Sequence, residues 1–465
     1  MRALAFWAHE PMLAYANNYD QIRAMRFLQV HPDKPDMSEP LGGTPGQPWR
    51  YFHHEKGWGE MMYPSSDLAV KAVQLVVPNL WRPAGALVDI KQGAWLLLAV
   101  WLVAMAWVAW RLGRANAWHA LGFSAWLLLV ADPVNLVFLN TWYAEFPAFA
   151  ALTGLVGLGW LWLAGCCRTR GAVWWGLGML LFLATNRNQY MYLPLALLPV
   201  AWWVWRARTQ AAGRPSPVLA LAAVAVVVVP LLLFGAKLGQ VKQANSANRV
   251  NTVLGAMLPA ASDPERMLRH LRLPPSCAQF SGQTWFSTPT DAYRADCPRV
   301  LRMSLTSLVP ALLADPAALG RMVMTATRNH QGFDQALLGQ VQGVEQGRVA
   351  ALPSLAARSV NDGLRALPTP GWQALVVVSL LLPGVMAAWA LKRREHAWGQ
   401  AWLALQIALA YVFFSSLLGD GYIEIERHAV LSYSLGCLLA VALVGWLVHV
   451  GAASRREAVV KEVLS

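Results

Sequence analysis

Charged residues are scarce in this sequence. Only 14% of its 465 residues are Asp, Glu, Lys or Arg, whereas about 25% is usual in a soluble globular protein. The hydrophobic share is 56%, and 24 residues are tryptophan. This composition excludes a soluble enzyme, a disordered chain and a disulfide-rich secreted module, and it indicates an integral membrane protein.

Cysteine is also scarce, since the chain contains only five. Cys166 and Cys167 are adjacent, and Cys437 lies in an apolar run. Cys277 and Cys297 share one polar region. No spacing among the five resembles a zinc site.

Acidic residues number 25 against 38 Lys and Arg, which gives a net charge of +13. In a soluble protein this excess would suggest nucleic-acid binding. No DNA- or RNA-binding motif is present, however, and we expect no nucleic-acid partner. The distribution of the basic residues along the chain is instead explained by a membrane topology.

Nine apolar segments approach the length of about 20 residues that a helix needs to cross a bilayer. The fourth and fifth are short and are separated only by residues 186–188, which predicts a tight helical hairpin. We therefore predict an all-α polytopic membrane protein with about nine transmembrane helices. The segments are residues 93–110, 117–138, 143–165, 171–186, 189–205, 216–236, 372–391, 397–418 and 429–450.

The loop charges orient these helices, because Lys and Arg accumulate in cytoplasmic loops. One set of alternating loops contains only Arg187 and Arg427 among its short members, so we expect it to lie outside. The other set, with the C-terminal tail, is expected to be cytoplasmic. Its basic residues are Arg111, Arg114, Arg168, Arg170, Arg206, Arg208, Arg214, Lys392, Arg393, Arg394, Arg455, Arg456 and Lys461.

This topology divides the chain into five parts. Residues 1–92 and 239–371 form two outer regions, and residues 93–238 and 372–452 form membrane blocks of six and three helices. Residues 453–465 form a cytoplasmic tail. The short acidic loop before the last span also falls on the outer face.

The first outer region contains two short amphipathic segments, residues 20–30 and 67–80. They are too short to span, and they are predicted to be helices that lie in the membrane interface. Residues 1–19 contain several polar residues, do not span, and have no signal-peptide pattern. Since an exported segment normally follows a span, we expect a further transmembrane helix ahead of residue 1.

The second outer region is predicted to be a small, mostly helical lobe that packs on the membrane block. Helical periodicity occurs over residues 245–257, 263–271, 315–328 and 352–367. Cys277 and Cys297 both lie in this lobe. Because the outer compartment permits disulfides, we predict that these two cysteines pair.

Acidic residues at a membrane boundary are costly and are usually functional. Asp20 begins the first interfacial segment, with Glu10 ten residues earlier; an aspartate there is also explained as a helix N-cap. Glu145 begins the third span with no basic residue nearby in sequence. An acid near a helix N-terminus is also favoured by the helix dipole.

Two further polar sites follow other spans. Arg187, flanked by Asn186, is the only basic residue in its outer turn and suits an anionic group such as a lipid phosphate. The alternative is an arginine that reaches lipid headgroups. The fourth site precedes the last span, where a solvated turn is the alternative. Its charged residues are Asp420, Glu424, Glu426, Arg427 and His428.

Together these sites place acids, arginines and a histidine at one rim of one helical bundle. A carboxylate there could accept the proton of an acceptor hydroxyl. Arginines could neutralise a departing phosphate, and a hydrophobic groove could hold a lipid tail. The set therefore suits a lipid-linked, anionic substrate.

With these features the chain resembles the GT-C superfamily of polytopic membrane glycosyltransferases. It is more specifically similar to bacterial membrane proteins of the glycan hexose transferase type. Residues 140–145 resemble an N-[ST]-[WFY]-[YF]-x-E motif, and residues 419–421 with 427–428 resemble a G-D-G…R-H motif. Asn248, Asn251 and the stretch from Leu273 and Pro274 to Cys277 are also similar.

The resemblance implies that a hexose passes, with inversion, from a polyprenyl-phosphate donor to a glycan or lipid acceptor. The reaction would occur on the periplasmic face of a bacterial inner membrane, in cell-envelope polysaccharide biosynthesis. The superfamily places a catalytic acid where Asp20 stands, and Glu145 and Asp420 are the other candidates. Asp20 belongs to Asn-Tyr-Asp and not to a paired-acid motif, which leaves the need for a divalent metal undecided.

Arg187, Arg427 and His428 are the candidates for binding the donor phosphate. Secondary site candidates are Glu10, Asn186, Glu424 and Glu426.

Three other functions remain open from the sequence. An O-antigen ligase or polymerase would use outer-loop Arg and His residues, such as Arg328 and His330. A transporter or flippase for lipid-linked glycans would need charges buried in mid-span, and Asp132 is the main candidate in the second span. A non-catalytic assembly protein is the third. Glycosyl transfer instead requires Asp20, Glu145, Arg187 and Asp420 to line one outward cavity.

Overall fold

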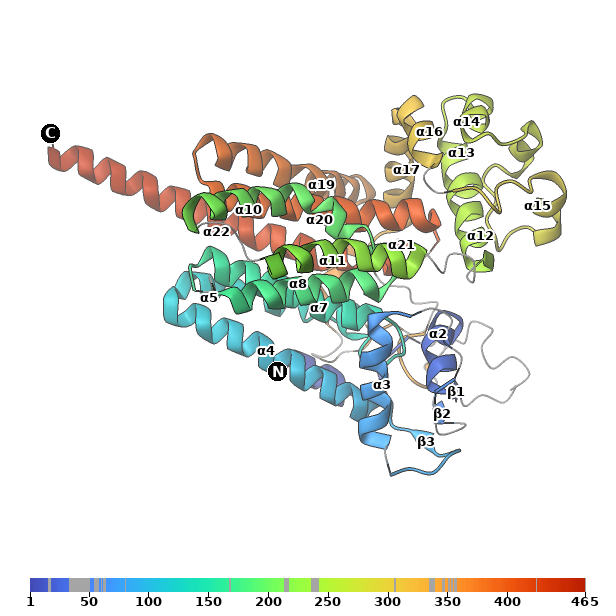
Figure 1. Ribbon diagram of the computed structural model, residues 1–465, viewed down its shortest axis with the longest axis horizontal. Helices are drawn as coiled ribbons and strands as arrows, with labels where there is room; N and C mark the ends of the chain where they lie inside the picture. Colours follow the sequence, from blue (N-terminus) through green and yellow to red (C-terminus); the bar gives the residue numbers. More distant parts are fainter. Residues whose placement is uncertain are drawn as a thin grey trace.

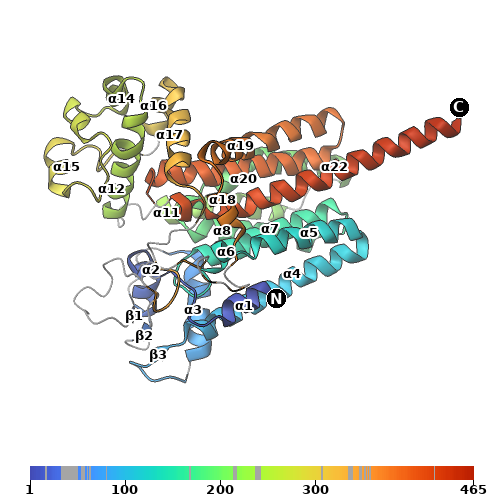
Figure 2. The ribbon, with the colours of Figure 1, turned by 180° about the vertical axis from the view of Figure 1, so that it is seen from behind.

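The most apolar segments form the longest helices, because a helix satisfies its own backbone hydrogen bonds in lipid. In the computed structural model, six helices among the described residues are long and apolar enough to cross a membrane. They lie side by side as one bundle (Figures 1 and 2). They are α4 (Ile90–Ala115), α7 (Glu145–Leu163), α11 (Pro217–Gly235), α19 (Thr369–Lys392), α20 (His396–Asp420) and α22 (Val430–Leu464).

The structure describes most of the chain. Residues outside the description are 16–17, 33–50, 54–57, 60, 62–63, 80, 167–168, 213–216, 236–241, 305–306, 334–338, 345–347, 350–351, 353, 355–357, 424 and 465, and some side chains within helices and strands, including that of Asp20, are also outside it.

Among the described residues, fewer helices than predicted are long and apolar enough to span a membrane. All nine predicted segments contain a helix, but α5 (Ala117–Val130), α8 (Arg170–Asn186) and α10 (Leu198–Ala212) have only 14, 17 and 15 residues. The predicted fifth span is interrupted by η1 (Asn188–Tyr190) and α9 (Leu193–Ala196). This region contains two prolines, each of which removes a backbone donor.

A seventh span is counted in the described part only if two helices that meet at 102° are taken as one. These are α16 (Leu308–Ala314) and α17 (Pro316–Asn329).

The predicted mid-span charge Asp132 lies beyond the end of α5. Its carboxylate caps α6 (Pro133–Leu136), with Oδ1 accepting from the Val134 N–H at 3.0 Å. It also accepts from the Ser359 hydroxyl at 2.5 Å and the Val360 N–H at 2.7 Å. Asp132, which is fully buried and also pairs with Arg2 at 3.4 Å, therefore ties α18 (Val360–Arg365) to the bundle.

The region predicted to be the first outer one, residues 1–92, lies at the end of the bundle opposite to the C-terminus (Figure 1). It contains α1 (Arg2–Ala8), α2 (Asn18–Leu28) and α3 (Ser66–Asn79), so both segments predicted to be interfacial helices are helical. A small antiparallel sheet, not expected in an all-α fold, joins β1 (Val30–Pro32), β2 (Tyr51–His53) and β3 (Leu87–Val88) in that order. Its strands have only two or three residues, too few for a sequence pattern of period two.

Helix α3 has an unusual distribution of side chains. Val73, Val76 and Val77 are exposed, whereas Lys71 and Gln74 are buried. In an amphipathic helix of a soluble protein, the apolar side chains would be buried and the polar ones exposed. Leu68 and Leu75 are buried beside the polar side chains, so the inward face is mixed. The apolar outward face suits a helix whose outer side meets lipid.

The region predicted to be the second outer one forms a helical lobe at the same end of the bundle (Figures 1 and 2). The predicted disulfide Cys277–Cys297 is present, with a Cα–Cα distance of 5.1 Å. The lobe core continues onto α20 through Phe413 and Leu417, so the lobe packs on the membrane block. Its other elements are α12 (Lys242–Val250), the π-helix η2 (Asn251–Met257), α13 (Leu258–Ala260), α14 (Pro264–Leu271), η3 (Pro275–Phe280) and α15 (Thr290–Asp296).

One predicted helix of this lobe is largely wrong. Of residues 352–367, the described part forms only the six-residue helix α18. The other three predicted segments match α12 with η2, α14 and α17.

Candidate functional site

An ion pair joins the polar site that begins the third predicted span to the one that follows the fourth. Glu145 is the first residue of α7, and Arg187 follows the last residue of α8. Because α7 and α8 are antiparallel neighbours, the start of one meets the end of the other. The Nη1 of Arg187 donates to Oε1 of Glu145 at 2.5 Å, and the Glu145 side chain is only 2% exposed.

His428, in α21 (Ile425–His428), connects this pair to the fourth polar site. Its Nδ1 lies 3.5 Å from Nη2 of Arg187, and its Nε2 lies 3.2 Å from Nη2 of Arg427. The Asp420 carboxylate is 3.7 Å from the same Nε2. Two guanidinium groups from distant parts of the chain therefore face one imidazole ring.

The environment of His428 favours the neutral ring. Burial lowers its pKa well below the usual value, and the charges of Arg427 and Arg187 lower this pKa further. A neutral imidazole has one donor and one acceptor nitrogen. At neutral pH it can therefore accept a hydrogen bond from an arginine and donate one to an anion.

Asp420 is positioned by the lobe. Its Oδ1 accepts a hydrogen bond from Nδ2 of Asn251 at 2.8 Å, and Asn251 also accepts from the Trp285 N–H at 2.8 Å. Gly421 follows with φ +60°, and a Cβ there would collide with the Asn251 carbonyl. The second glycine of the Gly-Asp-Gly turn is thus required for the close approach of bundle and lobe.

Several buried polar atoms near the ion pair have no hydrogen-bond partner among the described residues. They are both amide atoms of Asn186, Oε2 of Glu145 and Oε1 of Gln189. The Asn186 side chain is fully buried. Since buried polar groups are normally paired, these atoms give the cluster unused capacity to bind a polar ligand.

Two residues of this neighbourhood were not predicted. Lys71 is fully buried and donates to the Thr141 carbonyl at 2.7 Å. Tyr143 lies under the guanidinium of Arg427, 5.0 Å from ring centroid to Cζ, a distance that permits a cation–π interaction. The spacing of Lys71 four residues after Asp67 was the only sequence signal for its burial beside an acid.

Some predicted site residues lie elsewhere. Glu10 is exposed and pairs with Lys91 at 2.5 Å. The carboxylate of Glu426 lies 2.6 Å from Nδ1 of His330, on the side of α21 that faces a cavity. The side chain of Asp20 and the whole of Glu424 lie outside the described residues, although the backbone places Asp20 in the first turn of α2.

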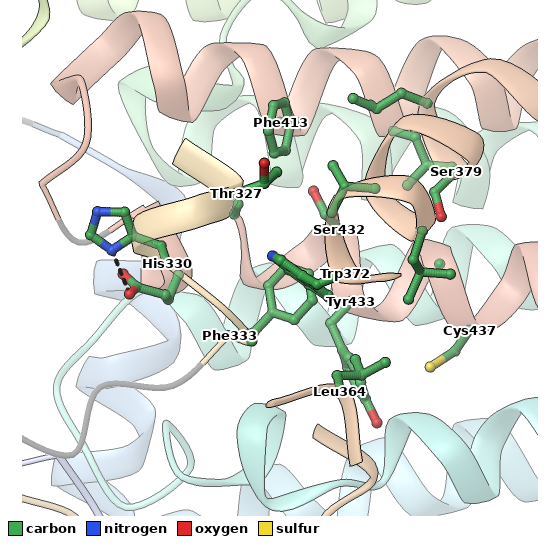
Figure 3. Close-up of a pocket in the computed structure, with 18 of the residues that line it drawn as sticks. Thr327, His330, Phe333, Leu364, Trp372, Ser379, Phe413, Ser432, Tyr433 and Cys437 are labelled. Carbon is green, nitrogen blue, oxygen red and sulfur yellow. Dashed lines mark hydrogen bonds and ion pairs between the residues drawn. The ribbon is translucent and has the colours of Figure 1, made fainter. Parts of the chain in front are cut away.

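The cavity beside Glu426 has a volume of about 260 Å³ and is lined mainly by apolar side chains. In Figure 3, Phe333, Trp372 and Phe413 project into it from different elements. The dashed contact in this view is the His330–Glu426 pair, and both of its residues line the cavity. Because α21 carries Glu426 next to Arg427 and His428, the apolar cavity and the polar cluster are adjacent.

In the part of the chain that the structure describes, no group of three or more His, Cys, Asp or Glu residues could hold a metal ion.

Comparison with known proteins places the chain in a family. The model of the YfdI N-terminal transmembrane domain matches residues 50–462. The chain belongs to this family. No curated protein and no solved structure matches it. Together with the bundle, membership of the YfdI N-terminal transmembrane domain family makes this a multi-pass membrane protein.

Proposed function

We propose that the protein is a membrane glycosyltransferase that uses a polyprenyl-phosphate sugar. The observation that carries the proposal is a polar cluster beside an apolar cavity. In this cluster Glu145 and Arg427 are buried, and Arg187, His428 and Asp420 are half-buried. Two arginines that face one neutral imidazole suit a phosphate with several anionic oxygens. The adjacent cavity suits the first part of a hydrocarbon tail.

The reaction follows from the chemistry of these groups. The hydroxyl oxygen of a glycan or lipid acceptor attacks the anomeric carbon of the sugar, and the bond from that carbon to the phosphate oxygen breaks. Arg187 and Arg427 stabilise the charge that develops on the leaving polyprenyl phosphate. The attack from the opposite side inverts the anomeric configuration.

The proton of the acceptor hydroxyl needs a carboxylate base. Glu145 is well suited, because Arg187 fixes one of its oxygens while Oε2 has no partner among the described residues. Asp420 is the second candidate, held by Asn251 at 2.8 Å. Asp20 remains the candidate that the superfamily resemblance implies.

The direct test is to incubate the purified protein in lipid nanodiscs with a panel of polyprenyl-phosphate sugars and acceptors. Release of polyprenyl phosphate with transfer of one sugar supports the proposal. Glu145→Gln, Asp420→Asn and Asp20→Asn identify the base, since a general base contributes typically 10²–10⁴-fold.

Two outcomes would favour other functions. Transfer of a whole glycan from a lipid diphosphate would indicate a ligase. Movement of the lipid across the nanodisc or vesicle membrane without bond cleavage would indicate a transporter.

A further inference from the structure

The turn that carries Glu145 is not fixed by its own helix. The N-cap of α7 is Ala144, which offers no side-chain hydrogen bond to the first turn. A serine, threonine or aspartate there would have fixed the start of the helix. The orientation of Glu145 therefore depends on contacts from other parts of the chain.

Helix α3 provides two of these contacts from one face. Nζ of Lys71 donates to the Thr141 carbonyl at 2.7 Å, and Nε2 of Gln74 donates to the Leu139 carbonyl at 3.3 Å. Lys71 also donates to Oε1 of Gln74 at 3.0 Å, which links the two side chains. Both carbonyls belong to the turn that leads into Glu145.

Other segments hold the same turn. Oε1 of Gln21 accepts from the Trp142 N–H at 2.7 Å, and Nδ2 of Asn140 donates to the Leu13 carbonyl at 3.0 Å. Neither of these contacts carries a charge. Lys71 is the residue that brings a titratable group to the turn.

A fully buried lysine is unfavourable unless nearby charges or a functional need compensate for it. We propose that Lys71 is a positioning residue, which acts through Thr141 to hold Glu145 in place and through its charge to adjust the basicity of that carboxylate. This inference rests on the proposed function, with Glu145 as the group that accepts the hydroxyl proton.

The charged groups that face Lys71 are Asp67 from its own helix, Glu145 from α7 and Arg23 from α2. Burial lowers the pKa of Lys71 to about 7, while Asp67 and Glu145 oppose this effect. A neutral amine still donates to Thr141 and Gln74, so the contacts persist above pH 7. The positive charge beside Glu145 is lost, however, and Glu145 becomes a better base.

The test compares Lys71→Met, Lys71→Arg and Gln74→Leu in nanodiscs. Lys71→Met is expected to lower turnover by about 10- to 100-fold, because small displacements of a reacting group are costly. Donor affinity should change less than twofold. The wild-type rate should rise through a step near pH 7, and this step should be absent in Lys71→Met, whereas Lys71→Arg should recover part of the turnover.

Lys91→Met is the matched control. Lys91 also donates to a backbone carbonyl, that of His9 at 3.1 Å, but its acidic partner is the exposed Glu10. The turnover and pH profile of Lys91→Met should be those of the wild type. Lys71→Met protein with wild-type turnover and an unchanged step near pH 7 would overturn the proposal.

A second variant and a second measurement apply if the main comparison cannot be made. If Lys71→Met does not fold, Gln74→Leu removes one uncharged contact to the same turn, and an unchanged turnover in that variant counts against the inference. If no donor is cleaved by the wild type, the proposed function fails, and hydrogen exchange of residues 139–149 then tests the contact alone. Faster exchange in Lys71→Met and Gln74→Leu, but not in Lys91→Met, supports it; equal exchange refutes it.

Discussion

Replacing Arg187 with alanine should reduce both the stability of the protein and its proposed reaction with a polyprenyl-phosphate sugar. The two effects have different origins in the structure. Arg187 is the ion-pair partner of Glu145, whose side chain is 2% exposed. It is also one of the two guanidinium groups at His428.

The stability effect follows from the buried carboxylate. Removal of one partner leaves Glu145 charged and unpaired, and breaking a buried pair typically costs about 3–5 kcal/mol. The double variant Arg187→Ala, Glu145→Gln removes the uncompensated charge. It should therefore unfold at a higher temperature than Arg187→Ala alone.

The catalytic effect should not recover in that double variant. Loss of one preorganised donor to a developing oxyanion lowers turnover by about 10²–10³-fold. Arg187→Lys keeps the charge but cannot hold Glu145, His428 and a phosphate with the same fork of donors. Arg187→Lys should therefore lose less turnover than Arg187→Ala, but its turnover should still be below that of the wild type.

The assay measures donor binding and polyprenyl-phosphate release by protein that elutes as a single species. Arg393→Ala is the control, because Arg393 stacks on Trp389 at the α19–α20 turn, the far end of α20 from Asp420. The reasoning is refuted if Arg187→Ala and Arg427→Ala both keep the donor affinity of the wild type. It is also refuted if the double variant regains turnover.

Four other outcomes are expected. Cys277→Ser should destabilise the lobe by roughly 3 kcal/mol, the value for a loop of this size, in thermal unfolding followed with and without reductant; equal midpoints would contradict this. Gly421→Ala should impair folding or turnover because a Cβ there meets backbone, whereas Gly419→Ala, which meets nothing within 4 Å, should be neutral. The unfolded chain binds more protons than the folded one between pH 7 and the ordinary pKa of lysine, 10.5, because burial lowers the pKa of Lys71 to about 7. Thermal stability should therefore rise with pH across that window, and Lys71→Met should flatten the rise. A cysteine introduced at Gly343 should react with an impermeant thiol reagent in intact cells, and one in the C-terminal tail should not; the opposite pattern would reverse the predicted topology.

Much of the architecture could be predicted from hydrophobicity and charge alone. Most apolar runs of about 18 residues or more became long helices, although residues 117–138 formed only the 14-residue α5. Glu145 and Arg187 lie at helix ends, as their flanking sequences indicate. The disulfide followed from the placement of two cysteines in one outer region. These features depend on local composition, which a single sequence contains.

The remaining features depend on contacts between distant segments. Residues 67–80 read as an amphipathic helix, but its apolar side faces outward, so Lys71 points into the protein and not into solvent. In α21, Glu426 faces the cavity while Arg427 and His428 face the polar cluster. A segment of four residues is too short for its sequence to indicate which side chains face the cavity and which face the polar cluster.

The ion pair and the imidazole also have a consequence for biosynthesis. Arg187 and His428 are 241 residues apart, so Glu145 and Arg187 enter the membrane long before α21 has been translated. During that interval the growing chain contains a neutralised acid–base pair and only one of the two arginines that face His428. A partly inserted chain therefore lacks Arg427 and His428, two of the residues proposed to bind the lipid phosphate, and the proposed anion site becomes complete only after α21 has been made.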